Sequence, residues 1–223
     1  MAGEDAGPRR VRLWDLPVRI VHWSFVLLMP ALWWTWRAGR MDLHQTLGHI
    51  LLALLLFRLF WGVAGSAPAR FASFVSGPRA VLAYARGRRA RPLLGHNPIG
   101  GWSVVALLSL IALEVAAGLF TQDTDGIESG PLARFVTYEQ ADSARFWHGL
   151  VFDALVVLIA VHVAAILFYR LVKRDDLVTP MLTGRKAVEG DIAEPAFVPA
   201  WRVAAGAAGA GLIAFWVSKG CPL

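Results

Sequence analysis

Residues 146–169 read FWHGLVFDALVVLIAVHVAAILFY, an apolar segment long enough to cross a membrane as one helix. It carries two histidines, His148 and His162, and their spacing of fourteen residues is close to four helical turns. The two imidazoles therefore project from nearly the same face, about 21 Å apart along the helix axis. A histidine inside a membrane span costs free energy unless it has a partner. The pair therefore suggests two redox centres, one near each edge of a bilayer core that is roughly 30 Å thick.

The composition indicates a membrane protein rather than a soluble one. Of the 223 residues, 57% are hydrophobic and 10 are tryptophan, and several apolar runs exceed the usual length of a soluble core helix. The net charge of +6 does not indicate nucleic-acid binding, because the basic residues lie between the apolar runs. The single cysteine, Cys221, excludes an internal disulfide and a cysteine-ligated iron–sulfur cluster. We predict an all-α membrane protein with spans at residues 18–36, 43–64, 99–120, 146–170 and 200–218.

The charges between the spans predict the orientation of the chain. Residues 65–98 contain arginines and no acidic residue, so the positive-inside rule assigns this loop to the cytoplasm, together with the basic N-terminus. The acidic loop at residues 121–145 is then expected to face outward. The first apolar run shows no cleavable-signal pattern and is expected to remain as a span of a multi-pass protein. Within the basic loop, residues 78–87 are typical of a short interfacial helix. The arginines of this loop are Arg70, Arg79, Arg86, Arg88, Arg89 and Arg91.

Two further histidines match the first two in depth. His44 lies at the outer start of the second span, level with His148, and His22 lies in the cytoplasmic part of the first span, level with His162. Two pairs of imidazoles at two depths are what two six-coordinate haems need, each lying between facing helices. The chain has no C-x-x-C-H motif, so both haems are expected to be b type. The sequence thus predicts two haem sites at two depths, each between facing helices of a bundle.

Three residues near these histidines suggest how a cofactor is accommodated. Gly48 follows His44 by one helical turn and leaves room for a flat macrocycle against the helix. Gly118 either does the same or is a packing residue of the lipid phase. Arg58 lies inside the second span, where an unpaired guanidinium is costly. It is expected either to bind a haem propionate or to snorkel toward the lipid headgroups.

Short motifs in a fixed order accompany these features and resemble a known family. The chain resembles the bacterial cytochrome b561 family over about residues 11–187, and in particular members similar to the cytochrome b subunit of nickel–iron hydrogenases. The resemblance implies a four-helix transmembrane haem-binding bundle with a fifth, C-terminal span, located in a bacterial inner membrane. It also implies that His22, His44, His148 and His162 are the axial ligands of two b haems. It also implies a di-haem domain at residues 1–187, followed by a linker and C-terminal helix at residues 188–223. The motifs are Leu13-Trp14-Asp15, His22-Trp23, His44 with Gly48, Arg58, Trp61-Gly62 and Gly65, Ala69-Arg70-Phe71, Leu94-Gly95-His96-Asn97-Pro98, Trp147-His148 with His162, and Met181-Leu182-Thr183-Gly184-Arg185-Lys186.

The roles expected for the remaining titratable residues near the spans are less specific. His49 is expected to be an interior hydrogen-bonded histidine rather than a ligand. His96 is either a turn residue, or a propionate partner or proton carrier near a quinone. Glu114 could carry protons or make an interhelical hydrogen bond, and Asp153 is expected to bond a neighbour near the outer haem.

These features predict transmembrane electron transfer through two b haems, between the quinone pool and a redox partner protein. The quinone follows from the resemblance, since the sequence shows no clear quinone pocket. The acidic outer loop could meet a basic extracytoplasmic protein, such as a c-type cytochrome or a hydrogenase-like subunit. One alternative is a self-contained quinone-linked enzyme, such as a superoxide oxidase or a metal-ion reductase. Another is a haem-free transporter whose histidines bind a metal ion.

Overall fold

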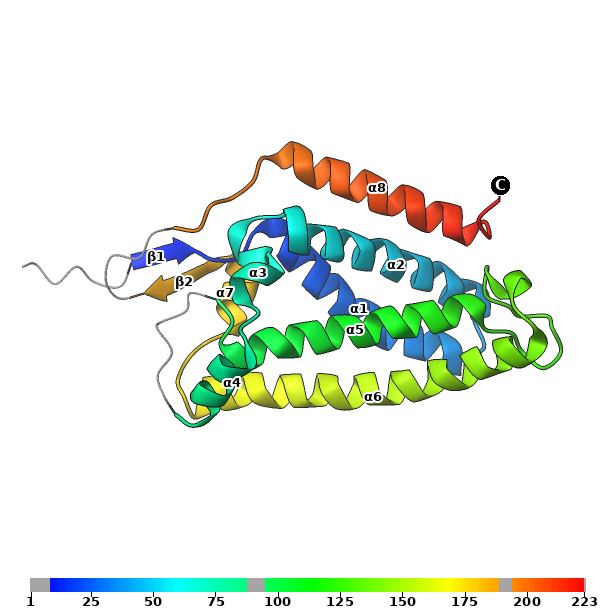
Figure 1. Cartoon of the computed structure of the whole chain (residues 1–223), viewed down its shortest axis with the longest axis horizontal. Coiled ribbons are helices and arrows are strands. Elements are labelled where there is room, and N and C mark those ends of the chain that lie inside the picture. The colour runs from blue at the N-terminus through cyan, green and yellow to red at the C-terminus, as the bar shows by residue number, and fades with distance from the viewer. Residues whose placement is uncertain (1–8, 88–94, 189–193, 223) are drawn as a thin grey trace, which may run out of the picture.

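The computed structural model describes residues 9–87, 95–188 and 194–222, and within them the predicted spans are confirmed as helices (Figure 1). Within these residues five helices are long and apolar enough to cross a membrane. Arg88, Arg89 and Arg91 of the predicted cytoplasmic loop lie outside the described residues. The five helices are α1 (Leu16–Arg37), α2 (Met41–Ala64), α5 (Pro98–Phe120), α6 (Tyr138–Leu171) and α8 (Ala200–Ser218).

Helix α6 begins at Tyr138, eight residues before the predicted start of its span at residue 146. Thr137 and Gln140 form a capping box, in which each side chain bonds the other residue's backbone N–H. The polar segment that follows is therefore helical as well, and it lengthens α6 beyond the apolar stretch. Hydropathy alone located the apolar stretch but not this polar first part of the helix.

Short elements fill the connections between the long helices. The interfacial helix predicted at residues 78–87 is confirmed as α4, which spans Pro78–Ala85 and packs against α5. The other short elements are α3 (Phe71–Phe74), α7 (Val178–Thr183), the 3₁₀ turns Ala67–Ala69 and Ala133–Phe135, and the strands β1 (Arg9–Arg12) and β2 (Arg185–Val188).

The helices α1, α2, α5 and α6 form the bundle, and α8 lies along its outside against α2 (Figure 1). The interior contains buried aliphatic side chains, among them Leu51, Ile111 and Leu155. Many large apolar side chains face outward instead, including Leu27, which is 70% exposed. Such a surface suits a lipid environment rather than water. The small residues of α8 allow close packing, because a Cβ at Gly206 would collide with the ring of Phe60.

The N-terminal segment and the segment after α6 meet at one end of the bundle. Strand β1 pairs antiparallel with β2, with Arg9 opposite Val188 and Arg12 opposite Arg185. The next two backbone N–H groups, of Leu13 and Trp14, donate to Gly184 O at 2.8 and 3.2 Å. The sequence analysis did not predict this strand pair. We call this end of the molecule, which also holds α4 and α7, the inner end (Figure 1).

Asp15 connects the start of α1 to the end of α2. It caps α1 by accepting a hydrogen bond from Val18 N at 3.1 Å, and it accepts a second one from Trp61 Nε1 at 2.8 Å. Asp15 and Trp61 are both buried. A side chain at Gly62 would collide with the ring of Phe71, so this glycine allows α3 to fold back onto α2. These motif residues therefore build the inner end.

Candidate functional site

His44 of α2 and His148 of α6 face each other near the end of the bundle opposite the inner end. Their ring centroids are 6.2 Å apart, and the rings are nearly perpendicular at 88°. We call them the outer pair. The structure therefore brings together the two histidines that the sequence analysis matched by depth, although they are more than a hundred residues apart in the chain.

Hydrogen bonds determine which ring nitrogen of each outer histidine is free. His44 Nδ1 lies 3.0 Å from Leu32 O and 3.3 Å from Thr35 Oγ1. His148 Nδ1 lies 2.9 Å from Glu114 O. Because a carbonyl oxygen can only accept, each Nδ1 is assigned the proton, which leaves Nε2 with a free lone pair. Metal-binding histidines have this arrangement, in which the second nitrogen orients the ring.

Glu114 of α5 supplies a second contact to the same histidine. Its Oε1 lies 3.2 Å from His148 Nδ1, while its Oε2 is buried without a partner among the described residues. The side chain is largely buried, whereas Asp153 of α6 is exposed. Of the two roles considered for Glu114, the interhelical contact is thus the one that the structure contains.

The two glycines near the outer pair differ in their surroundings. A Cβ built on Gly48 would meet nothing within 4 Å, so there is open space beside this residue. A Cβ on Gly118 would lie 3.0 Å from His148 Cε1. Gly118 therefore allows the imidazole itself to pack against α5.

His22 of α1 and His162 of α6 form a second, inner pair. They lie close enough to interact electrostatically, and His22 Nδ1 is buried without a hydrogen-bond partner among the described residues. Beside it, Trp23 Nε1 donates to Met181 O at 3.2 Å, which connects α1 to α7. Unlike the outer pair, these two imidazoles make no ring contact in the described part of the chain.

His96 lies beside the inner pair and is packed among aromatic side chains. Its ring centroid is 4.9 Å from that of Trp14 and 4.8 Å from that of Phe74. The adjacent Asn97, not His96, caps α5, by accepting a bond from Gly100 N at 2.7 Å. Burial lowers the pKa of His96 to about 4, with smaller contributions from Arg58 and the two inner histidines. His96 is therefore not a solvated turn residue, and the sequence alone did not reveal its place in this cluster.

The lowered pKa of His96 predicts an acid-sensitive step in stability. The unfolded chain protonates this histidine near its ordinary pKa, whereas the folded protein does so only near pH 4. The unfolded state thus binds more protons in between, and stability falls as the pH is lowered through this window. We expect the His96 contribution to fall by about 2 kcal/mol between pH 7 and pH 5. Thermal melts of the wild type and of His96→Gln at both pH values measure it, and the variant should lose less stability. Equal losses in the two proteins would contradict the prediction.

Arg58 lies at the same end and is only 7% exposed, so the snorkelling interpretation is wrong. Its Nη1 donates to Ala69 O at 3.4 Å, and its guanidinium lies over the ring of Phe71 with 5.1 Å to the ring centroid. Among the described residues it has no ion pair with an acid. A buried cation of this kind can bind an anionic group.

His49 is half-buried, and no hydrogen bond to it is found in the described ranges, so the expected interior hydrogen bond is absent there.

The structure also contains no group of three or more His, Cys, Asp or Glu side chains that could hold a metal ion, as far as the described residues show.

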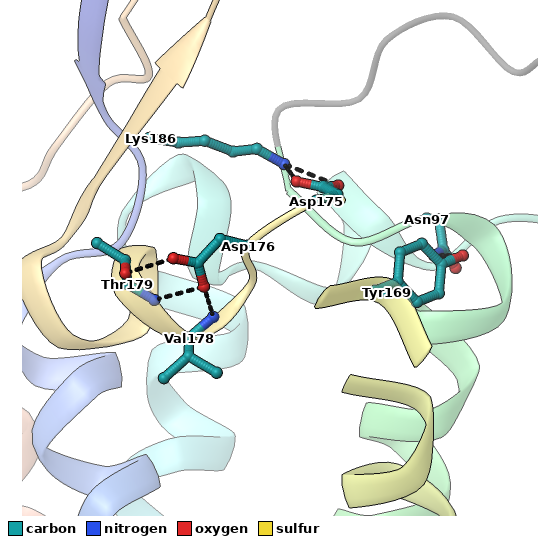
Figure 2. Close-up of polar contacts among 7 residues, drawn as sticks. All are labelled: Asn97, Tyr169, Asp175, Asp176, Val178, Thr179 and Lys186. Atoms are coloured by element: carbon teal, nitrogen blue, oxygen red, sulfur yellow. Dashed lines mark hydrogen bonds and ion pairs between the residues drawn. The ribbon is translucent and has the colours of Figure 1, made fainter. Parts of the chain in front are cut away.

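Polar contacts hold the connections at the inner end. Asn97 Nδ2 donates to Tyr169 Oη at 2.8 Å, and the hydroxyls of Tyr169 and Tyr84 are 2.6 Å apart. These bonds join α4, α5 and α6. Figure 2 shows further polar contacts near α7. Asp176 bonds Val178 and Thr179 at the start of α7, and Lys186 of β2 pairs with Asp175 at 3.0 Å. The hydrogen bonds from Thr179 lower the pKa of Asp176 below its ordinary value.

Comparisons with known proteins identify a family and a relative of this chain. The model of the family described as prokaryotic cytochrome b561 matches residues 13–184. A curated relative from Bradyrhizobium diazoefficiens, named "Probable Ni/Fe-hydrogenase B-type cytochrome subunit", is 24% identical over 226 residues, which cover 83% of this chain and 90% of the relative. No solved structure gives a significant match. The chain belongs to the prokaryotic cytochrome b561 family and is a multi-pass membrane cytochrome b of electron transport.

Proposed function

We propose that this protein carries electrons across a bacterial inner membrane, between the quinone pool and a redox partner protein, through two haems b. His44 and His148 would bind one haem, and His22 and His162 the other. Haem supplies a reversible one-electron change at its iron, and the protein supplies the ligands, the burial and the spacing. The family membership supports haem b as the cofactor.

The geometry of the outer pair is the observation that carries this proposal. A metal–imidazole bond of about 2 Å on each side, with about 1 Å more from each nitrogen to its ring centre, gives centroids about 6 Å apart. The observed separation of 6.2 Å fits one metal ion between the two rings. Both Nε2 atoms are free to bind it, and the open space beside Gly48 suits a flat macrocycle. The donor set therefore fits a bis-histidine haem.

At the inner end, the side chains present fit the second haem. His22 and His162 supply two imidazoles, and the buried Arg58 supplies a cation for a propionate. His96 packs beside them and adds to the aromatic surroundings of the site.

The charges of the loops and the relative's name support a redox partner protein and an orientation of the chain in the membrane. The loop between α5 and α6 is acidic and is closed by Gln122 pairing with Ser129, so it presents acidic side chains opposite the inner end. With the arginine-rich inner end in the cytoplasm, this loop would meet a basic extracytoplasmic protein. The relative's name supports a hydrogenase-like subunit in that role.

Pyridine haemochrome analysis of the purified protein tests the proposal. The expected result is b-type spectra with two haems per chain, and a reduced α band that responds to added quinol. One haem or none would overturn the di-haem proposal. A reporter fused within the basic loop tests the orientation separately, since activity only outside the cell would reverse it.

Replacing Glu114 with glutamine should raise the reduction potential of the outer haem. A carboxylate 3.2 Å from His148 Nδ1 stabilises positive charge on the imidazole and so on the oxidised iron that it binds. An amide is a weaker acceptor, so we expect an upward shift of roughly 60 mV, a tenfold change in a one-electron equilibrium. The backbone bond from Glu114 O remains, so the haem should stay bound. Redox-titrated absorption spectra measure the shift.

Asp153→Asn is the matched control. It also removes a carboxylate near the outer pair, but Asp153 is exposed and has no hydrogen bond to His148 within the described residues. Its potential should change much less. Equal shifts in the two variants would mean that the charge acts through space and not through the histidine.

A further inference from the structure

Helix α8 makes a cleft that the four-helix bundle would not have. Helices α1 and α8 each pack against α2, and the space between them is a cleft with a volume of about 660 Å³. Its floor includes Leu54 and Phe57 of α2, and its walls include Ile20 of α1 and Ala207 of α8. Because the side chains of α8 that line the cleft are mostly small, this wall projects little into it. The cleft is within the size range of ligand sites in proteins.

The lining changes from apolar to polar toward the inner end. Arg12, Asp15 and Ser66 lie there, whereas the rest of the lining is almost entirely aliphatic, aromatic or alanine. The two charged side chains, Asp15 and Arg12, differ in whether they are accessible to a ligand. Asp15 is buried and accepts hydrogen bonds from Val18 and Trp61 through its two oxygens. Arg12 is exposed, and its guanidinium stacks on Phe197 with 4.2 Å to the ring centroid. Within the described residues it makes no ion pair with an acid.

We propose that this cleft binds a phospholipid with an anionic headgroup, whose phosphate pairs with Arg12 and whose acyl chain lies between α1 and α8. The apolar walls match a hydrocarbon chain, and the Arg12 guanidinium, which pairs with no acid within the described residues, matches a phosphate at the same end. Basic pockets between membrane helices on the cytoplasmic side bind anionic lipid headgroups in the same way. The lipid would fill the gap between α8 and α1 and so attach the fifth helix to the bundle.

Native mass spectrometry of the purified holoprotein tests this, with phosphatidylglycerol, phosphatidylcholine or ubiquinone added in detergent. The wild type should retain one phosphatidylglycerol about tenfold more strongly than phosphatidylcholine, because both carry a phosphate but the choline cation of phosphatidylcholine cancels its net negative charge near Arg12. Arg12→Gln should abolish this preference. Equal retention of both lipids by the wild type, or retention of ubiquinone in preference to them, would overturn the proposal.

A second pair of variants tests the place of binding. Ala207→Phe fills the cleft from the α8 wall, while Ala208→Phe adds the same side chain at an exposed residue outside the lining. Retention of phosphatidylglycerol should fall at least tenfold in the first variant and remain unchanged in the second. Unchanged retention by Ala207→Phe, or an equal loss in both variants, would contradict binding in this cleft. Should Ala207→Phe fail to fold, the exposed Arg12→Gln variant still decides the question.

Discussion

Replacing either His44 or His148 with alanine is expected to remove the same haem and to leave the other one bound and reducible. The two rings face each other across 6.2 Å from different helices, so each variant removes one of the two ligands of a single site. His22→Ala and His162→Ala should give the complementary loss. The haem-to-protein ratio should fall from two toward one in all four variants. Redox-titrated spectra should show two pairs of matching losses.

His49→Ala is the control for this series. His49 lies on the same helix as His44, five residues later, but His44 is the one that faces His148. The control should keep both haems. Loss of a haem in His49→Ala with none in His44→Ala would move the ligand on α2 and leave the two-haem arrangement standing. Loss of both haems in every single variant would show that the bundle does not hold the two sites independently.

The long helices and the outer pair could be predicted from the sequence because they depend on local regularities. A run of apolar residues must form a helix in lipid, where each backbone N–H needs an internal partner. Depth then follows from 1.5 Å per residue, so residue number and direction are enough to place His44 level with His148. The capping box at Thr137 is a local signal for the start of α6, but the polar residues after it do not indicate a membrane span.

The inner end could not be predicted in the same way, because its contacts join segments far apart in the chain. The pairing of β1 with β2 depends on two strands of four residues, each too short and too basic to indicate a strand alone. His96 precedes a helix cap, a position that usually lies in solvent, and only the folding of Trp14 and Phe74 around it makes it buried. The contact of Glu114 with His148 likewise required the packing of α5 on α6.

Gly48→Leu is expected to remove the outer haem while leaving the protein folded. Gly48 lies one turn from His44 on the same face of α2, and a Cβ there meets no protein atom within 4 Å. A leucine can therefore be built without a clash inside the chain, and it favours the helix by up to about 1 kcal/mol over glycine. The same side chain would occupy the space proposed for the macrocycle. We expect the haem content to fall toward one per chain, with the spectral loss that His44→Ala gives.

Gly209→Leu separates this steric effect from a general effect of larger side chains in the membrane. Gly209 also lies inside a helix, is half-buried and has open space around its Cβ, but it belongs to α8, and no histidine atom among the described residues lies within 4 Å of that Cβ. That variant should keep both haems and gain similar helix stability. Thermal melts of both variants check the folding, and haem titration checks the site. If Gly48→Leu kept its full haem content, the open space beside Gly48 would not be where the cofactor lies, and the outer haem would have to approach His44 and His148 from another side. If it lost both haems and unfolded, the free space around Gly48 would be needed by the protein itself.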